Sequence, residues 1–387
     1  MSIHLIHSAR VVSGNQLDDD GWVLLREGRV ESRGVGDSWR AIAAETQSLT
    51  LTDAHGHWLT PGFIDIHGHG GAGCSYDEGE SAIRTALDMH QHHGTTRAVL
   101  SLVSAPLETL ETRLASIGMA MRRDARVLGA HCEGPFLDPG HKGAHDPSTL
   151  APPHRETVNR LLEAGSGVLR QITIAPELPG GLDAVREYVD AGVAVAVGHT
   201  NADYADTLAA FDAGATILTH AFNAMNGLHH REPGPVGAAL HTAGVTLEVI
   251  NDGTHVHPEV VRVLFASAPH RIALITDSMA AAGQTDGDYR LGSLAVTVTG
   301  GVARLTNGGA IAGSTLTQDE ALRRSVHEVG VDVRDAVRAL TETPAAVIGR
   351  SGDLGRLEPG YAADAVLLDS DFRVLDVWSA GIALSER

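Results

Sequence analysis

Short apolar runs, many rich in β-branched residues, recur through the middle of the chain. They lie at 63–67, 97–103, 126–131, 169–175, 193–198, 215–220, 246–251 and 272–276. Because these runs are almost continuously apolar and do not alternate with polar residues, they predict strands that are buried on both faces of a parallel sheet.

Segments with helical periodicity separate several of these runs. They include 81–94, 154–165, 181–192, 201–214 and 258–269, and most of them end at a glycine. Glycine just after the last periodic residue is a common stop signal of a helix. Eight strands that alternate with helices predict an α/β fold of the (β/α)8 barrel type, and a doubly wound open sheet is the alternative.

The two ends of the chain have a different pattern. Residues 1–58 contain short strand-like segments broken by Gly, Asn and Asp, and residues 353–387 repeat that pattern. Such segments are typical of hairpins. We therefore expect a small discontinuous β-sandwich domain formed by both termini, around a catalytic barrel at 59–352. Within the barrel, 290–314 is expected to form a hairpin that turns at Gly300–Gly301, followed by a glycine-rich loop over the site.

Composition narrows the choice of partners and compartment. The 387 residues are 43% hydrophobic, and 48 acidic against 29 basic residues give a net charge of −19. This charge argues against nucleic acid and anionic membranes as partners, although a local cluster of donors could still bind an anionic small molecule. Two cysteines, Cys74 and Cys132, give no disulfide framework. With no signal peptide or long apolar span in the sequence, we expect a cytoplasmic protein.

Polar residues suited to metal binding stand where the predicted strands end. They are His67 and His69 after the first run, Glu133 after the third, His199 after the fifth, His220 after the sixth and Asp277 after the eighth. In a (β/α)8 barrel these ends meet at one rim, where the chemistry takes place. Imidazole and carboxylate ligands suit Zn2+, Fe2+, Co2+ or Mn2+. The fourth run contains no lysine, which excludes a carbamylated lysine there as a bridge between two ions. Glu133 is therefore the carboxylate available to bridge them.

A divalent metal at this rim predicts hydrolysis. A bound ion can lower the pKa of water from 15.7 to about 7, which makes a nucleophile available at neutral pH. Attack on an amide also needs a group that takes the proton of the water and returns it to the departing amine. Asp277, at the end of the eighth run, suits the role of general base and then acid.

Several motifs carry a resemblance to a known family. PGFIDIHGHG, HCEGPFL with KGAH, GHTNA, THAFNAMNGLHHREPG, NDGTHVHPE and TDSMAAAG resemble the amidohydrolase superfamily and, within it, the N-acetylglucosamine-6-phosphate deacetylases. The resemblance implies removal of the acetyl group of N-acetylglucosamine 6-phosphate in amino-sugar catabolism and cell-wall recycling. Alternatives are another N-acyl substrate such as N-acetylgalactosamine 6-phosphate, or a non-catalytic scaffold of the same fold.

The resemblance also implies roles for single residues. Glu133, His199 and His220 would hold the first ion, for which Zn2+ is the expected metal, and His67 with His69 would allow a second ion. Asp277 would be the catalytic acid and base. His145, in KGAH, would contact the scissile acetamide and polarise its carbonyl.

The remaining residues implied by the resemblance bind the phosphorylated sugar. Substrate contacts are expected from Ala144, Asn223, Ala224, Arg231, Asp252, Gly253, Thr254, His255, Ile311, Ala312 and Gly313. Among them, Asn223 and Ala224 would offer backbone donors to the phosphate, with Arg231 and His255 as its charged partners. In this family one phosphate contact can come from the neighbouring subunit, which implies a homodimer.

Overall fold

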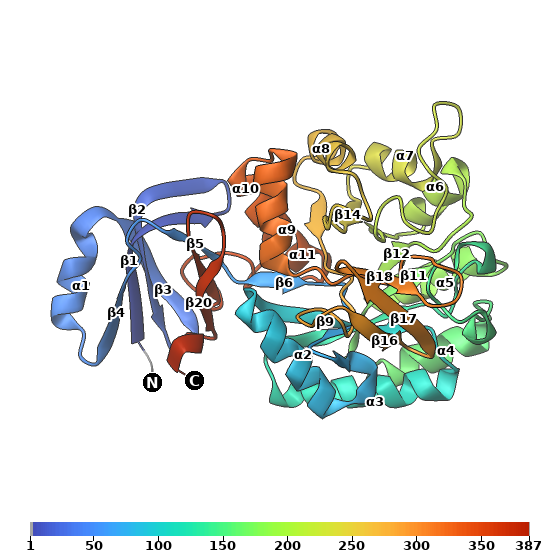
Figure 1. Cartoon of the computed structure of the whole chain (residues 1–387), viewed down its shortest axis with the longest axis horizontal. Coiled ribbons are helices and arrows are strands. Elements are labelled where there is room, and N and C mark those ends of the chain that lie inside the picture. The colour runs from blue at the N-terminus through green and yellow to red at the C-terminus, as the bar shows by residue number, and fades with distance from the viewer. Residues whose placement is uncertain (1–2, 387) are drawn as a thin grey trace. The chain divides into compact units, whose positions relative to one another are not determined.

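The computed structural model describes residues 3–386, which form two compact units (Figure 1). The first unit contains the chain up to Ile64, the segment His90–Arg97 and the chain from Gln318 onward, and the second contains Asp65–Met89 and Ala98–Thr317. The domain boundaries expected at residues 58 and 352 stay a prediction. Within the described residues, no helix has both the length and the apolar character needed to cross a membrane.

Eight parallel strands pair in the order in which they occur along the chain. They are β6 (Phe63–Asp65), β9 (Thr95–Val103), β10 (Val127–Glu133), β11 (Leu169–Ile174), β12 (Ala194–Val197), β13 (Ile217–Leu218), β14 (Thr246–Val249) and β15 (Ile272–Leu274). Beyond the last strand, the N–H of Asp277 donates to the carbonyl of His67 at 2.8 Å, and the N–H of His69 donates to the carbonyl of Ser278 at 2.7 Å. These bonds bring the first and last strands together, and the predicted barrel is confirmed.

Helices surround these strands in Figure 1. They are α2 (Glu80–His92), α3 (Leu107–Arg123), α4 (Arg155–Ala164), α5 (Gly181–Asp190), α6 (Tyr204–Asp212), α7 (Gly234–His241) and α8 (Pro258–Ser267). Each buries one apolar stripe: in α5, for example, Ala184, Val185 and Tyr188 are buried at helical spacing. The strands are therefore covered on the outside, as their nearly continuous apolar sequences require.

A small antiparallel sheet packs over the carboxyl ends of the barrel strands. It consists of β16 (Gly287–Leu291), β17 (Leu294–Thr299) and β18 (Val302–Leu305). The predicted turn at Gly300–Gly301 joins β17 to β18, and both glycines have positive φ, +59° and +76°. The sheet also has a first strand, β16, of which the predicted segment 290–314 contains only the last two residues. The apolar side chains of the sheet pack against Val103, the last residue of β9, and against Met279, in the segment that follows β15.

The first unit joins both ends of the chain in one sheet. The strands are β1 (Ile3–Ser13), β2 (Gln16–Arg26), β3 (Arg29–Val35), β4 (Leu49–Asp53), β5 (Trp58–Pro61), β19 (Ala365–Leu368), β20 (Val374–Ser379) and β21 (Ile382–Ala383). Antiparallel pairing of β5 with β19 connects the terminal segments. Neighbouring residues of β1 belong to different apolar clusters, Leu5 with Trp39 of α1 (Trp39–Glu45) and Ile6 with Trp378. The discontinuous β domain is thus built from both termini, as predicted.

Candidate active site

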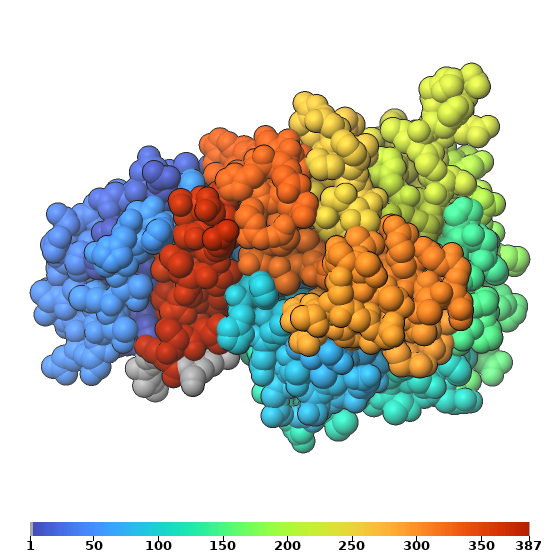
Figure 2. Space-filling model, in the orientation of Figure 1, coloured from blue at the N-terminus to red at the C-terminus, as the bar shows by residue number. Residues whose placement is uncertain are grey.

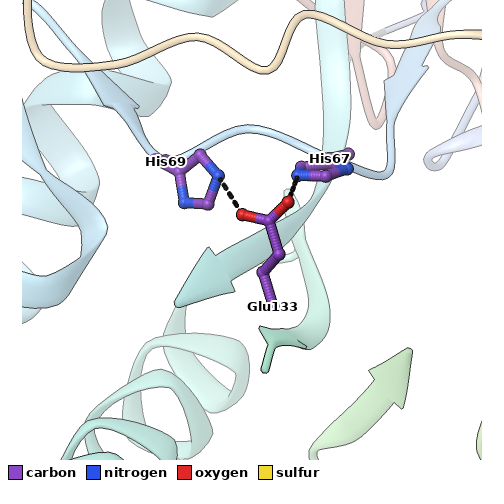
Figure 3. A group of neighbouring side chains, drawn as sticks. All are labelled: His67, His69 and Glu133. Atoms are coloured by element: carbon purple, nitrogen blue, oxygen red, sulfur yellow. Dashed lines mark ion pairs between the residues drawn. The ribbon is translucent and has the colours of Figure 1, made fainter. Parts of the chain in front are cut away.

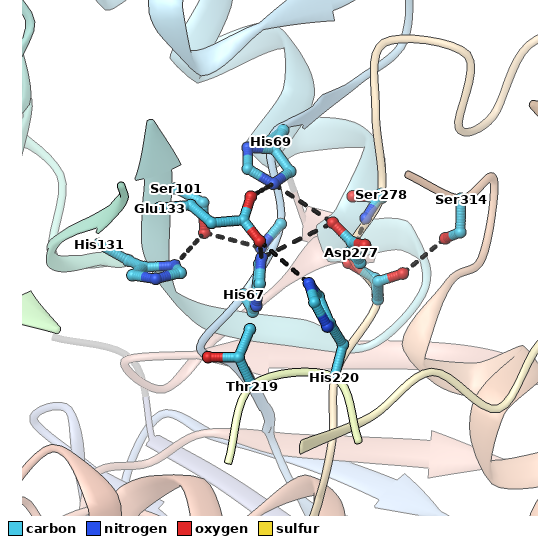
Figure 4. Close-up of polar contacts among 12 residues, drawn as sticks. His67, His69, Ser101, His131, Glu133, Thr219, His220, Asp277, Ser278 and Ser314 are labelled. Carbon is cyan, nitrogen blue, oxygen red and sulfur yellow. Dashed lines mark hydrogen bonds and ion pairs between the residues drawn. The ribbon is translucent and has the colours of Figure 1, made fainter. Parts of the chain in front are cut away.

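The predicted metal ligands and Asp277 meet at the carboxyl ends of the barrel strands. Their side chains come from the segments after β6, β12, β13 and β15 and from the last residue of β10: His67, His69, Glu133, His199, His220 and Asp277. All six are at most 8% exposed. Figure 4 shows most of them around the carboxylate of Glu133.

Glu133 lies between the two histidines that follow β6 (Figure 3). Its Oε1 is 3.3 Å from Nε2 of His67, and its Oε2 is 3.2 Å from Nε2 of His69. Oδ1 of Asp277 lies 3.2 Å from the same nitrogen of His69 and 3.7 Å from Nε2 of His67. His67, His69 and Glu133 are close enough together to hold one ion.

A second set of ligand atoms surrounds the same oxygen of Glu133. Oε1 is 3.0 Å from Nε2 of His199 and 3.2 Å from Nε2 of His220, and these two nitrogens are 3.0 Å apart. Ligands placed 2.0–2.1 Å from a tetrahedral zinc ion are about 3.3 Å from one another. The triangle formed by Glu133, His199 and His220 therefore has nearly the size that such an ion requires.

The opposite ring nitrogens show why these contacts fit a cation better than hydrogen bonds. Nδ1 of His199 is 2.9 Å from the carbonyl of His141, and Nδ1 of His67 is 2.9 Å from Oε2 of Glu248. Carbonyl and carboxylate oxygens only accept, so both rings carry a proton on Nδ1. In the neutral rings, Nε2 then presents a lone pair to the lone pairs of Glu133. A second proton on a ring or a cation between the groups would remove this repulsion, and the donor set fits a divalent ion.

The charges of the site favour the same conclusion. Burial raises the pKa of Asp277, but the hydrogen bond from His69 and the charge of His67 outweigh it and hold the pKa below its usual value. Burial lowers the pKa of His69, whereas its contacts with Asp277 and Glu133 raise the pKa to about 9. The two carboxylates therefore stay ionised and attract positive charge, which a proton or a metal ion can supply.

Unusual backbone geometry presents three of these side chains. His199, His220 and Asp277 have positive φ angles of 49°, 24° and 46°, although none of them is glycine. This conformation is costly for residues with a side chain and persists only where surrounding contacts enforce it. Each of the three lies two or three residues after the end of a barrel strand, so the chain turns sharply as it leaves the sheet and directs the side chain into the site.

Three polar residues beneath the site had no predicted role in binding the ion or substrate. Glu248 of β14 contacts His67, and Nε2 of Gln171 donates to Oε1 of Glu248 at 2.7 Å. His131 lies 2.9 Å from the hydroxyls of both Ser101 and Thr173, and its ring packs edge-on against His67 at 4.6 Å. An acidic residue inside the apolar run of β14 was the sequence signal for Glu248.

A cavity of about 340 Å³ opens above the cluster. Predicted residues that line it are His69, Glu133, Ala144, His145, His199, His220, Asn223, Ala224, His255, Asp277, Ile311 and Gly313. Nε2 of His145 is 3.3 Å from Oε2 of Glu133. His141 and Leu291, for which the sequence predicted no role, also line the cavity. The cavity thus joins the candidate ligands to most of the predicted sugar and phosphate contacts.

Other predicted contacts lie away from this cavity. Arg231 lines a separate hollow beside Tyr204, in the segment between β13 and α7 that projects from the second unit in Figure 2. Ala312 is buried in the apolar cluster under the small sheet. Asp252, Gly253 and Thr254 precede His255, and Oδ2 of Asp252 lies 2.7 Å from Nδ1 of His255. Asp252 thus positions His255, and its own contact with substrate stays a prediction.

The chain is similar to proteins of known activity along its whole length. It matches the amidohydrolase family over residues 58–383. It is 37% identical over 382 residues to an N-acetylgalactosamine-6-phosphate deacetylase of Escherichia coli O157:H7, with 98% of each chain covered. It is 35% identical over 384 residues to an N-acetylglucosamine-6-phosphate deacetylase of Vibrio furnissii, with 98% of this chain and 94% of that protein covered.

Solved structures give the same picture. A mutant N-acetyl-D-glucosamine-6-phosphate deacetylase from Mycobacterium smegmatis, in complex with N-acetyl-D-glucosamine-6-phosphate, matches with a TM-score of 0.92 and 38% identity over 99% of each chain. A deacetylase of the same name from Pasteurella multocida matches with a TM-score of 0.92 and 25% identity, over 98% of this chain and 99% of that chain.

Proposed function

The chain belongs to the amidohydrolase family, whose members are metal-dependent, and we propose that it hydrolyses the acetamide of N-acetylglucosamine 6-phosphate to acetate and glucosamine 6-phosphate. The observation that carries this proposal is the buried ring of imidazoles around Glu133, with Asp277 beside it, at the floor of a cavity that His255 and Asn223 line farther out. The proposed setting is amino-sugar catabolism and cell-wall recycling in the cytoplasm.

The residues that would hold the metal are those whose lone pairs converge. Glu133, His199 and His220 would hold one divalent ion, and His67, His69 and Glu133 would hold a second. Zn2+ fits the size of the first triangle, and Fe2+, Co2+ and Mn2+ accept the same ligands. When bound, such an ion polarises an amide carbonyl and lowers the pKa of water.

Asp277 would carry the proton during hydrolysis. Its carboxylate is ionised and lines the cavity, so it can accept a proton from the water that attacks the acetamide carbon. As the C–O bond forms and the C–N bond breaks, the same carboxyl returns that proton to the amine nitrogen of the sugar. Positioned proton transfer of this kind contributes about 10²–10⁴-fold to a rate.

His145 would stabilise the negative charge that develops on the carbonyl oxygen. Burial lowers the pKa of this histidine, its contact with Glu133 offsets part of the effect, and the resulting pKa is about 4. The ring is therefore neutral near pH 7 and can donate one hydrogen bond into the cavity. A donor directed at the developing oxyanion lowers the barrier more than it stabilises the substrate.

The phosphate would bind at the opposite side of the cavity. Asn223 and Ala224 lie just after β13, where their backbone can face an anion. Burial lowers the pKa of His255, but the hydrogen bond and charge of Asp252 outweigh it and raise the pKa above its ordinary value. Arg231 lies outside the cavity of its own chain, and we propose that it completes the phosphate site of a partner subunit in a homodimer.

One experiment tests the substrate. Acetate release should be measured from N-acetylglucosamine 6-phosphate, N-acetylgalactosamine 6-phosphate and unphosphorylated N-acetylglucosamine, with elemental analysis of the same protein. The galactosamine epimer is the second candidate, because one relative carries that name. Equal turnover with and without the phosphate would contradict the phosphate site. No acetate from any of the sugars, with metal present, would contradict the proposed activity.

A further inference from the structure

Glu248 is a carboxylate with no exposed surface that lies behind the candidate metal ligands. It belongs to β14, is 0% exposed and does not line the cavity. Its ion pair within residues 3–386 is with His67, whose Nδ1 is 2.9 Å from its Oε2. A buried carboxylate requires compensation by hydrogen bonds or by nearby positive charge, since otherwise its desolvation would destabilise the fold strongly.

The remaining contacts of Glu248 hold its carboxylate in one orientation. Oε1 accepts a hydrogen bond from Nε2 of Gln171 at 2.7 Å, and Oε2 lies 3.4 Å from the backbone N–H of His220. Glu248 therefore contacts one candidate ligand through its ring and another through its backbone. Because Gln171 directs Oε2 toward His67, the ring of His67 can rotate little.

This geometry determines what the ring of His67 offers to the cluster. The proton on Nδ1 points to Glu248, so Nε2 points to Glu133 and stands 3.3 Å from its Oε1. A carboxylate behind a histidine raises the basicity of the opposite nitrogen and fixes its direction toward a metal. Glu248 also adds a negative charge to those of Glu133 and Asp277. A single divalent ion would leave part of these three negative charges unbalanced, which favours a second ion.

We propose that Glu248 is a positioning residue that fixes His67 as a ligand for the second divalent ion that this site would hold. The inference rests on the proposed metal-dependent activity. Glu248 and Gln171 would act through His67 and not by contact with the substrate. We therefore expect the second ion to depend on Glu248, whereas the ion held by His199 and His220 should not.

Glu248→Gln is the sharpest test, because the amide has nearly the same shape as the carboxylate. Oε1 of Gln171 has no hydrogen-bond partner among the described residues. Gln171 can therefore flip its amide, so that its Oε1 accepts from the NH2 group introduced at position 248. The amide oxygen at that position still accepts from Nδ1 of His67. The substitution thus removes the charge and leaves the packing in place.

The full-length protein is stripped with a chelator and titrated with Co2+, followed by visible absorbance and elemental analysis. The wild type should take up two equivalents, and E248Q should bind the second about 10–100-fold more weakly. Thr173→Val is the matched control, since Thr173 is buried on the same strand as Gln171 and bonds to His131 and Thr219. T173V should keep both equivalents.

Two results would overturn the inference: a single equivalent in the wild type, or two equally tight equivalents in E248Q. Neither depends on turnover, so failure of the proposed activity is recognised separately by the absence of acetate release. Thermal unfolding establishes whether E248Q folds. If E248Q does not fold, the number of Co2+ equivalents bound by Gln171→Leu tests the inference instead. This substitution leaves the charge of Glu248 and the ring of His67 in place, but it frees the carboxylate to turn away from His67.

Discussion

The backbone N–H of Ser104 donates to Nδ1 of His145 across 3.3 Å, so the neutral ring carries its proton on Nε2. That nitrogen is the one that lies 3.3 Å from Glu133 at the cavity. His145, Glu133 and His199 are close enough to hold an ion. A protonated nitrogen, however, cannot ligate a metal. Ser104 thus favours the tautomer in which His145 could serve as the proposed hydrogen-bond donor to the substrate.

Replacing His145 by alanine should lower kcat and leave the metal content unchanged. Loss of a single donor to an oxyanion costs about 10²–10³-fold in kcat, because the contact is strongest in the transition state. Steady-state acetate release gives kcat and KM, and elemental analysis gives the ion count. His145→Asn, which keeps an N–H group, is the control and should recover part of the loss.

The pH profile separates this role from acid–base catalysis by the same ring. With a pKa of about 4, His145 gains a proton only below the range in which the enzyme would be assayed. The wild type and H145A should therefore show parallel profiles of kcat above pH 5. A limb near neutral pH that disappears in H145A would contradict a neutral donor, as would loss of a bound ion.

Asp277→Asn should abolish most of the turnover while the protein stays folded. The amide cannot accept the proton of the attacking water, so we expect kcat to fall by about 10²–10⁴-fold. Acetate release is compared with the ion content and the unfolding midpoint of the same preparation. Turnover within a few-fold of the wild type would exclude Asp277 as the proton carrier.

The barrel could be predicted because the signal is repeated. Each strand is an apolar run, and the run stops at a polar residue where the chain leaves the sheet, as at Glu133 and His220. Since parallel strands bring these stops to one rim, the composition of the site followed from the strand pattern. The order of strands followed as well, because consecutive βα units pair side by side.

The rest of the site depends on contacts that a linear pattern does not contain. His199, His220 and Asp277 are not glycines, and tertiary contacts impose their positive φ angles. Glu248 stands in a run that otherwise looks like packing, and its role appears only when β14 is placed behind His67. The separation of Arg231 from the cavity is likewise a matter of where a long connection folds.

Asp364→Ala should destabilise the unit that contains both chain ends. Asp364 accepts from Nε of Arg97 at 2.6 Å, from Nη2 at 3.0 Å and from the N–H of Ala380 at 2.7 Å. Arg97 and Asp364 are 9% and 7% exposed at their side chains. Removing one partner of a buried ion pair costs about 3–5 kcal/mol.

Urea unfolding measures the effect, and KM for the phosphorylated sugar is the control. Asp364→Asn, which can still accept one hydrogen bond, should lose less stability than D364A. Because Asp364 lies in the first unit and the candidate site in the second, the folded variant should keep the wild-type KM. A loss below about 1 kcal/mol would mean that the pair behaves like an exposed one.

The position of Arg231 predicts that two defective subunits restore each other. Arg231→Ala alone should raise KM for the phosphorylated sugar and change unphosphorylated sugar little, because it removes a charge from the phosphate site. If Arg231 serves the partner's site, a heterodimer of R231A with D277N contains one site with both Asp277 and a donated Arg231. Mixed and re-equilibrated subunits should then turn over substrate with near wild-type KM at up to half the wild-type activity per heterodimer. If Arg231 instead acts within its own chain, each site of the heterodimer keeps one defect, and mixing would give no more activity than the two variants measured apart.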